Sequence, residues 1–407
     1  MLFSARDDTV VRVRLDGTSE SVDPRESMRA LPALLQPLLT WLVGKPLAGE
    51  RPWCLGPWHH LGASIVPLAA GTTMSALAVV AGGWWLLVLP VSWLLTVHGA
   101  RKLRTMILHQ CSHGNFLRRK APDTVIGQLI AVALVTQEFE EYRREHVVDH
   151  HSSSHMTLDD PTVQFLIIGM GARAGMSRQM LWHRLGATLI SPPFHVKATY
   201  ARIASHFRGT STAHRLVLVS FLVTVAGIVM VSGTWLPFLV AWIVPLTVLF
   251  NAAAALRLSS RHVFPSPGPR LSGRAALASY THGVFLGERA PDSSLPPARR
   301  LTLWVRWWAR MLLVHLPSRL FVFVGDGPCH DYHHRYPRSR DWANYIFARQ
   351  QDMARGHPGW PAYTEVWGLH AAIDAVFVSL SQADVDAYDP AQVTSASPGE
   401  LLAAFEE

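Results

Sequence analysis

The stretch LGASIVPLAAGTTMSALAVVAGGWWLLVLPVSWLLTVHG, Leu61–Gly99, contains no acidic residue, lysine or arginine. Gly82 and Gly83 divide it into an arm from about Leu61 to Ala81 and a second arm from Trp84 to about Gly99. Each arm has about the length that an α-helix needs to cross a hydrocarbon core roughly 30 Å thick. Because a glycine pair favours a sharp turn, we predict a hairpin of two membrane-spanning helices.

A second apolar stretch repeats this pattern. It runs from Leu216 to Val231, turns at Ser232-Gly233 and returns from Trp235 to Leu256. The same end of both hairpins is flanked by basic residues, namely Arg101, Lys102, Arg104, Arg208, Arg215, Arg257 and Arg261. Such residues mark the cytoplasmic side of a membrane protein. We therefore expect both termini to be cytoplasmic, and we place the protein in a bacterial inner membrane.

The composition favours a membrane protein over a large soluble helical core with two buried hairpins. Hydrophobic residues make up 49% of the 407 residues and charged residues only 16%, and there are 15 tryptophans. Soluble domains are normally about a quarter charged, and tryptophan favours the membrane–water interface. The net charge of +8 comes from scattered arginines, which indicates lipid headgroups rather than nucleic acid as the partner.

Two shorter apolar segments are predicted to lie at the membrane surface. Thr124–Gln137 is too short to span comfortably, so we interpret it as a re-entrant or interfacial helix. Ala298–His315 is amphipathic at helical spacing, as expected of a helix lying in the interface. The predicted fold is therefore an all-α integral membrane fold, with four transmembrane helices in two hairpins and a cytoplasmic, histidine-rich helical cap.

Three clusters of histidines lie next to the predicted membrane ends, all on the arginine-rich side. HQCSH contains His109 and His113; REHVVDHHSSSH contains His146, His150, His151 and His155; and CHDYHHRYP contains His330, His333 and His334. Residues four apart share a helix face. We therefore expect His109 with His113, and His146 with His150, each to converge on one ion, and the third cluster to present one face.

The ligand type leaves several metals open, because neutral imidazole suits zinc, copper, iron and nickel. Structural zinc takes four ligands, often including thiolates, whereas this chain has about twice as many clustered imidazoles and its three cysteines form no CxxC pair. Two metal ions are therefore the more economical prediction. Neither HExxH nor ExxH occurs, which excludes the familiar zinc peptidase and the carboxylate-rich di-iron bundle as templates. A histidine-rich pair of irons fits best.

The three motifs HxxxH, HxxxHH and HxxHH, with a membrane hairpin between the second and third, resemble those of the integral-membrane fatty acid desaturase and hydroxylase superfamily. The resemblance covers about Trp53 to Gln350, and it includes YRREHVVDHH, the DDP of Asp159–Pro161, HHRYP and RLSSRH (Arg257–His262). It implies a membrane desaturase domain over residues 53–350, between an N-terminal cytoplasmic segment (1–52) and a C-terminal cytoplasmic tail (351–407).

The resemblance also implies the site residues. The expected metal ligands are His109, His113, His146, His150, His151, His262, His330, His333 and His334. For the ninth ligand we favour His262, which follows the fourth span, but the long segment before His330 leaves His282 and His315 as alternatives. His155, Asp149 and Asp331 are expected in supporting positions, orienting the ligands.

Members of this superfamily use two ferrous ions and O2 to make an oxidant that removes hydrogen from an unactivated C–H bond. We expect the introduction of a double bond into a fatty acyl or related chain, with hydroxylation of an acyl or hydrocarbon chain as the alternative. The substrate carrier is open between a lipid, coenzyme A and acyl carrier protein. Electrons are expected from a separate ferredoxin, rubredoxin or cytochrome with its reductase. A metal transporter is disfavoured, because it would need polar groups within the spans.

Overall fold

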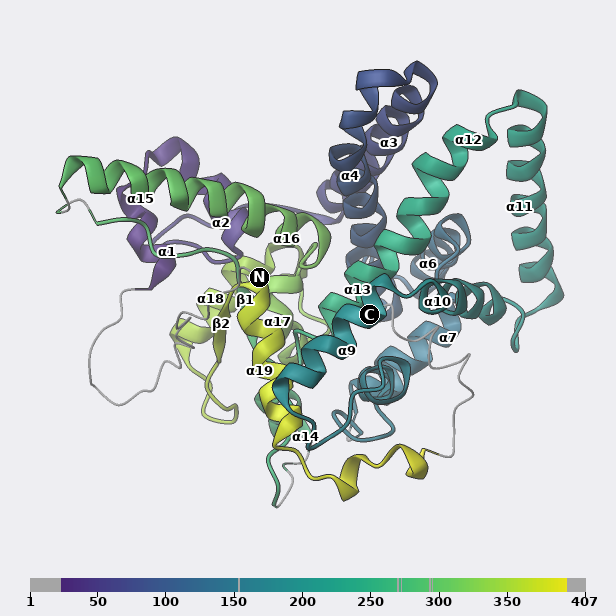
Figure 1. Cartoon of the computed structure of the whole chain (residues 1–407). Coiled ribbons are helices and arrows are strands. Elements are labelled where there is room, and N and C mark those ends of the chain that lie inside the picture. Colours follow the sequence, from purple (N-terminus) through teal and green to yellow (C-terminus); the bar gives the residue numbers. More distant parts are fainter. Residues whose placement is uncertain are drawn as a thin grey trace.

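The computed structural model describes residues 23–152, 154–268, 271, 273–292, 294 and 296–393. Four helices are long and apolar enough to cross a membrane: Pro57–Ala81, Gly83–Ser112, Thr212–Ser232 and Trp235–Leu258. They form two hairpins that rise from a helical cap (Figure 1). The predicted fold class is thus confirmed. The ends of the chain, and with them the predicted location of the termini, lie outside the described residues.

The first hairpin is held together by close backbone contact. It joins α3 (Pro57–Ala81) to a continuous helix made of η3 (Gly83–Val88), α4 (Leu89–Lys102), η4 (Leu103–Leu108) and α5 (His109–Ser112). A Cβ atom on Gly71 would lie 2.4 Å from the backbone nitrogen of Thr96, and one on Gly99 would lie 2.5 Å from that of Leu68. Small residues therefore let the two helices approach, as in many membrane helix pairs.

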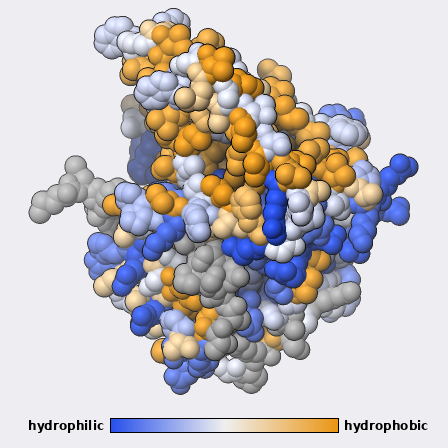
Figure 2. Space-filling model, turned by 90° about the vertical axis from the view of Figure 1, so that its right-hand side faces the viewer, coloured by the Kyte–Doolittle hydropathy of each residue, from blue (hydrophilic) through white to orange (hydrophobic). Residues whose placement is uncertain are grey.

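The second hairpin packs more loosely. It consists of α11 (Thr212–Ser232), α12 (Trp235–Phe238), the π-helical segments η7 (Leu239–Ile243) and η8 (Pro245–Leu249), and α13 (Phe250–Leu258). Apolar side chains of α11 such as Val223 and Val231 are exposed. Hydrophobic residues gather over the hairpin end of the molecule and hydrophilic residues over the cap (Figure 2), as expected when one end contacts lipid and the other contacts water.

The cap contains the remaining elements of the described chain. Before the second hairpin these are α1 (Pro24–Ser27), η1 (Met28–Ala30), η2 (Ala33–Leu35), α2 (Gln36–Val43), α6 (Lys120–Leu134), α7 (Phe139–Arg144), η5 (Glu145–His150), α8 (Pro161–Gln164), η6 (Phe165–Gly169), α9 (Arg178–Ile190) and α10 (Pro192–Ser205). After it come α14 (Gly273–Ser279), α15 (Pro297–Arg310), η9 (Met311–His315), α16 (Leu316–Phe321), η10 (Gly327–Cys329), α17 (His330–Arg335), η11 (Trp342–Asn344), α18 (Tyr345–Arg355), α19 (Leu369–Ser381), η12 (Asp386–Tyr388) and η13 (Pro390–Gln392).

One feature of the cap departs from a purely helical fold. The strands β1 (Gly283–Phe285) and β2 (Glu365–Trp367) pair in parallel, with Val284 opposite Val366. The pair is fixed by a buried charge network, in which the Arg349 guanidinium bonds both carboxylate oxygens of Asp331 and also contacts Glu365 at 3.0 Å. This network ties α17, which carries the third histidine motif, to α18 and β2.

The two predicted surface helices are present. α15 runs crosswise to the first hairpin (Figure 1), with Leu301 and Val305 exposed and Trp307 buried. The indole of Trp307 donates to the Glu288 carbonyl at 3.0 Å, which fixes α15 on the cap. The predicted segment Thr124–Gln137 corresponds to α6 from Thr124 to its end at Leu134, and the helix begins earlier, at Lys120. α6 packs on η4 and α5.

Candidate metal centre

The histidine motifs meet where the spans join the cap. His109 belongs to α5, the extension of the second span into the cap, and His113 ends that helix. The second motif begins in η5, and the third lies in α17. His262 lies just after α13. All nine predicted ligands are buried except His151, which is partly buried. They form two groups, each with its ligand atoms within 4.8 Å of one another.

The first group consists of His109, His113, His146, His151 and His333. The Nε2 atom of His146 lies 2.9 Å from that of His109 and 3.0 Å from that of His113. The Nε2 atom of His333 lies 2.8 Å from that of His109 and 3.1 Å from that of His151. Five rings from three separate segments therefore each direct their Nε2 atom into one small volume.

The second group consists of His150, His262, His330 and His334. The Nε2 atom of His334 lies 3.0 Å from that of His330 and 3.3 Å from that of His150. The ring centroid of His262 is 4.8 Å from that of His334. Among the three candidates for the ninth position, the structure brings only His262 into a group. His282 contacts the Ser260 carbonyl, and His315 contacts Glu288.

The second and third motifs each divide between the two groups, and here the expected pairing is wrong. His146 and His150, four residues apart, belong to different groups, whereas His146 and His151, five apart, share one. The reason is that η5 is π-helical, and the His151 amide donates to the His146 carbonyl. In a π-helix the fifth residue, not the fourth, follows the same face.

The third motif, in contrast, lies on the α-helix α17. His330 and His334, four apart, meet in the second group, while His333 reaches the first. The expectation that the whole motif presents one face is therefore corrected: His333 and His334 are adjacent in sequence and point to different groups. Each of these two motifs contributes to both groups, which holds the groups side by side.

The protonation of the rings suits metal binding. Burial, reinforced by neighbouring charges, lowers the pKa of His146, His151, His262, His330, His333 and His334 well below the usual value, and lowers that of His113 to about 3. The rings are therefore neutral near pH 7. Neutral imidazole carries one N–H and one lone pair, and the lone pair is what ligates a metal.

For His109 and His262, hydrogen bonds on the outer ring nitrogen decide where the lone pair points. The Nδ1 of His109 lies 3.1 Å from the Thr105 carbonyl, which can only accept, so Nδ1 carries the proton and Nε2 the lone pair. The Thr281 hydroxyl donates to the Leu277 carbonyl and is 3.1 Å from Nδ1 of His262, so it accepts from that nitrogen. The buried Nε2 of His262 is left with no hydrogen-bond partner among the described residues. Each group therefore receives at least one ring lone pair, which is the donor that a bound metal cation requires.

Asp160 is a supporting residue that the sequence analysis missed. Its carboxylate is buried, lies 3.0 Å from Nδ1 of His150 and 3.2 Å from Nδ1 of His155, and also accepts from the backbone amides of Met156 and Thr162. Burial would raise the pKa of Asp160, but the adjacent His150 and His155 hold it well below its usual range. The DDP motif contained this residue, and an aspartate before proline at a helix start was the available signal.

The other predicted supporting residues lie in different surroundings. His155 stacks edge-on against His150 and His262, with ring centroids 4.8 Å away in both cases. The Asp331 carboxylate points to Arg349 rather than to a histidine ring. Asp149 is partly buried and lines a polar cavity. A guanidinium also reaches the second group, since Arg261 lies 3.1 Å from Nε2 of His330.

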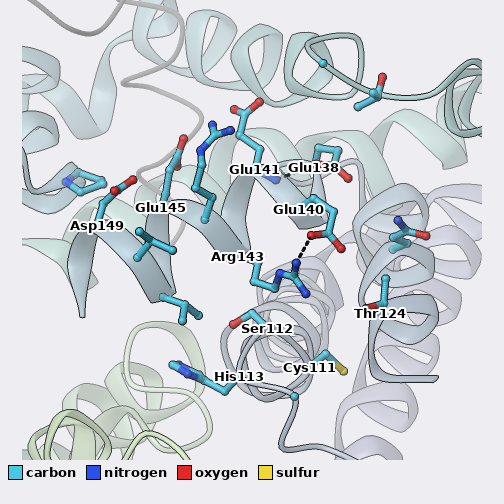
Figure 3. Close-up of a pocket in the computed structure, with 18 of the residues that line it drawn as sticks. Cys111, Ser112, His113, Thr124, Glu138, Glu140, Glu141, Arg143, Glu145 and Asp149 are labelled. Atoms are coloured by element: carbon cyan, nitrogen blue, oxygen red, sulfur yellow. Dashed lines mark hydrogen bonds and ion pairs between the residues drawn. The ribbon is translucent and has the colours of Figure 1, made fainter. Parts of the chain in front are cut away.

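The polar cavity has a volume of about 1320 Å³ and opens beside His113 (Figure 3). Acidic and basic side chains line it together, and several of them pair, as Arg143 does with Glu140 at 2.8 Å and Arg208 with Glu141 at 2.5 Å. His113 of the first histidine group therefore borders a polar cavity in which acidic and basic side chains occur together.

Comparison with known families agrees with this geometry. Residues 82–367, more than half of the chain, match the fatty acid desaturase family, and this range includes every histidine of both groups. A comparison with curated proteins gave no match. The four apolar spans and the family match together identify a membrane protein. The chain therefore belongs to the fatty acid desaturase family, membrane oxidoreductases of fatty acyl chains that use two irons.

Proposed function

We propose that the protein is an O2-dependent desaturase that introduces a double bond into a fatty acyl chain, using two iron ions held by the two histidine groups. His109, His113, His146, His151 and His333 would hold one iron, and His150, His262, His330 and His334 the other. The observation that carries the proposal is the convergence of nine imidazoles in two groups, neither of which includes a carboxylate. The unpartnered Nε2 of His262 supports it most directly.

The iron pair would supply the oxidising power that removal of hydrogen from an unactivated methylene requires. The chain's own residues position the ligands and exclude water. Thr105, Asp160 and Thr281 fix the rings of His109, His150 and His262 through the outer nitrogens. Such contacts orient a ligand and raise its basicity. The burial of the rings keeps them neutral and keeps bulk water from the groups.

Substrate, electron source and location are further parts of the proposal. The acyl chain enters from the bilayer and is carried by a lipid, coenzyme A or acyl carrier protein. Electrons come from a separate ferredoxin, rubredoxin or cytochrome with its reductase, which the basic residues near the cap would attract. The cap and both termini face the cytoplasm of a bacterial cell, in agreement with the arginines at the cap end of the hairpins.

Product analysis tests the proposed reaction. The protein, expressed in a bacterial host with and without O2, should yield an O2-dependent product that is two hydrogen atoms lighter than a host acyl chain. The His333→Ala variant, expressed to the same level, should yield none, because it loses a ligand of the first group. A product heavier by one oxygen atom would assign hydroxylation instead, and a product formed by His333→Ala would contradict the proposed centre.

A further inference from the structure

A second cavity is lined by a set of residues that shares no member with the polar cavity. Its volume is about 180 Å³, and its walls come from α2, the start of α3, α4, α16 and α18. Aromatic and aliphatic side chains such as Trp41, Trp53 and Phe347 form much of the lining. We call this cavity the lysine pocket, because Lys102 at the end of α4 lines it.

Lys102 differs from the other lysines of the chain. Lys45 pairs with Asp23 at 2.5 Å and with Glu365 at 2.6 Å, and Lys120 and Lys197 are exposed. Lys102 is only 8% exposed, yet it makes no hydrogen bond or ion pair with any described residue. Burying an ammonium group without a partner is unfavourable by several kcal/mol or more. Its presence in a cavity wall therefore indicates a partner that the chain does not supply.

The charge around Lys102 points to an anion. Arg319 also lines the pocket, and its guanidinium bonds the carbonyls of Trp41, Phe323 and Gly325 and the hydroxyl of Tyr345. These acceptors are uncharged, so the positive charge of Arg319 remains and repels that of Lys102. Among the described residues no aspartate or glutamate lines the pocket. This contrasts with the polar cavity, where acids and bases pair.

The place of the pocket in the fold favours an amphiphile. His59 and Ala63 line it and are exposed on α3, so the pocket reaches the surface there, at the basic end of the first hairpin. Trp58 and Ile65 nearby are exposed as well. An apolar chain could leave the pocket along this face, while an anionic group stays inside near Lys102. His109 lies seven positions after Lys102 on one continuous helix, or roughly 10 Å further along its axis, and the pocket lining includes no member of either histidine group.

We propose that the lysine pocket binds the anionic headgroup, a carboxylate or a phosphate, of a membrane amphiphile, with Lys102 as its principal charged partner and Arg319 as a second positive charge. A free fatty acid would supply the carboxylate and a phospholipid the phosphate. The inference is independent of the proposed reaction, because it concerns binding at a site apart from the histidine groups.

Binding measurements on the full-length protein in an uncharged detergent test the proposal. Decanoate, decyl phosphate and the neutral analogue decanol are titrated by calorimetry against the wild type and the variants Lys102→Met, Lys102→Arg and Lys197→Met. A hydrogen bond to a charged group contributes enough that Lys102→Met should weaken binding of the anion about ten- to a hundredfold. Lys102→Arg keeps the charge, and Lys197→Met removes an exposed lysine, so both should bind like the wild type.

The two sources are distinguished by which probe binds and by mass spectrometry of lipid extracted from the purified protein. Tighter binding of decanoate than of decyl phosphate assigns a fatty acid, and the reverse assigns a phospholipid. Equal affinity for decanol, or unchanged anion binding in Lys102→Met, would overturn the proposal. Thermal unfolding gives a second readout: without amphiphile, Lys102→Met should unfold at the same or a higher temperature than the wild type. Unfolding at a lower temperature would show that the ammonium already has a favourable environment.

Discussion

Asp160→Asn isolates the part that the supporting carboxylate plays at the metal centre. Asparagine has nearly the same shape and caps a helix as well as aspartate does, so it preserves the start of α8, where Asp160 accepts from the Thr162 amide at 2.8 Å. It cannot, however, accept from both His150 and His155, because its one amide oxygen replaces two carboxylate oxygens and its NH2 group donates. The ring of His150 would lose its charged partner and with it the tautomer that directs Nε2 into the second group.

The size of the effect follows from the two contacts at 3.0 and 3.2 Å. A hydrogen bond to a charged group contributes about 1.5–3 kcal/mol, and mutation of a residue that orients a metal ligand typically weakens metal affinity about 10–100-fold. We therefore expect Asp160→Asn to release iron from the second group at a chelator concentration about 10–100-fold lower than the wild type requires.

The assay is a chelator titration of the purified protein at pH 7, with bound iron measured at each step. Asp149→Asn is the matched control, because Asp149 directly precedes His150 in η5 but lines the polar cavity. Its iron should titrate like that of the wild type. If Asp160→Asn retains iron as well as the wild type, or if Asp149→Asn releases it as easily, the assigned contact does not support the centre.

Three other substitutions test separate parts of the structure. His262→Ala should lower the iron content of the purified protein, while His282→Ala should leave more iron bound; the opposite order would move the ninth ligand into the longer loop. Asp331→Asn breaks a buried bidentate pair with Arg349 and should lower the free energy of unfolding by about 3–5 kcal/mol; an unchanged denaturation midpoint would contradict this. Gly99→Leu should prevent the first hairpin from packing, since even a Cβ atom would lie 2.5 Å from the Leu68 backbone, whereas Gly227→Leu meets no atom within 4 Å. Size-exclusion chromatography should show aggregation of the first variant alone.

The spans could be predicted from the sequence because length and charge determine them locally. The glycine pair at Gly82 and Gly83 and the turn at Gly233 gave the correct hairpins. The second span was predicted to end near Gly99, but it continues to Ser112. Arg101 and Arg104 mark the end of the apolar run in the sequence, but both are buried: Arg101 lies over the ring of Phe250 in the second hairpin and Arg104 over that of Tyr142 in the cap.

The assignment of histidines to the two groups could not be predicted, because it depends on the helix type. A change from α-helical to π-helical winding at η5 exchanges His150 for His151 in the first group, and no local pattern indicated that change. The partner of Asp331 also depends on the packing of α17 against α18, since Arg349 lies 18 residues further along the chain. His262, by contrast, was favoured because it directly follows a span, and the structure places it in the second group.

The metal content of the purified wild-type protein tests the central claim most directly. Two histidine groups with separate ligand sets predict about two iron ions per chain. His334→Ala, which removes a ligand of the second group only, should leave about one, and His333→Ala should leave the iron of the second group. A stable preparation with a single zinc ion per chain would contradict the account. So would a variant outside both groups, such as His315→Ala, that loses both irons to the same extent.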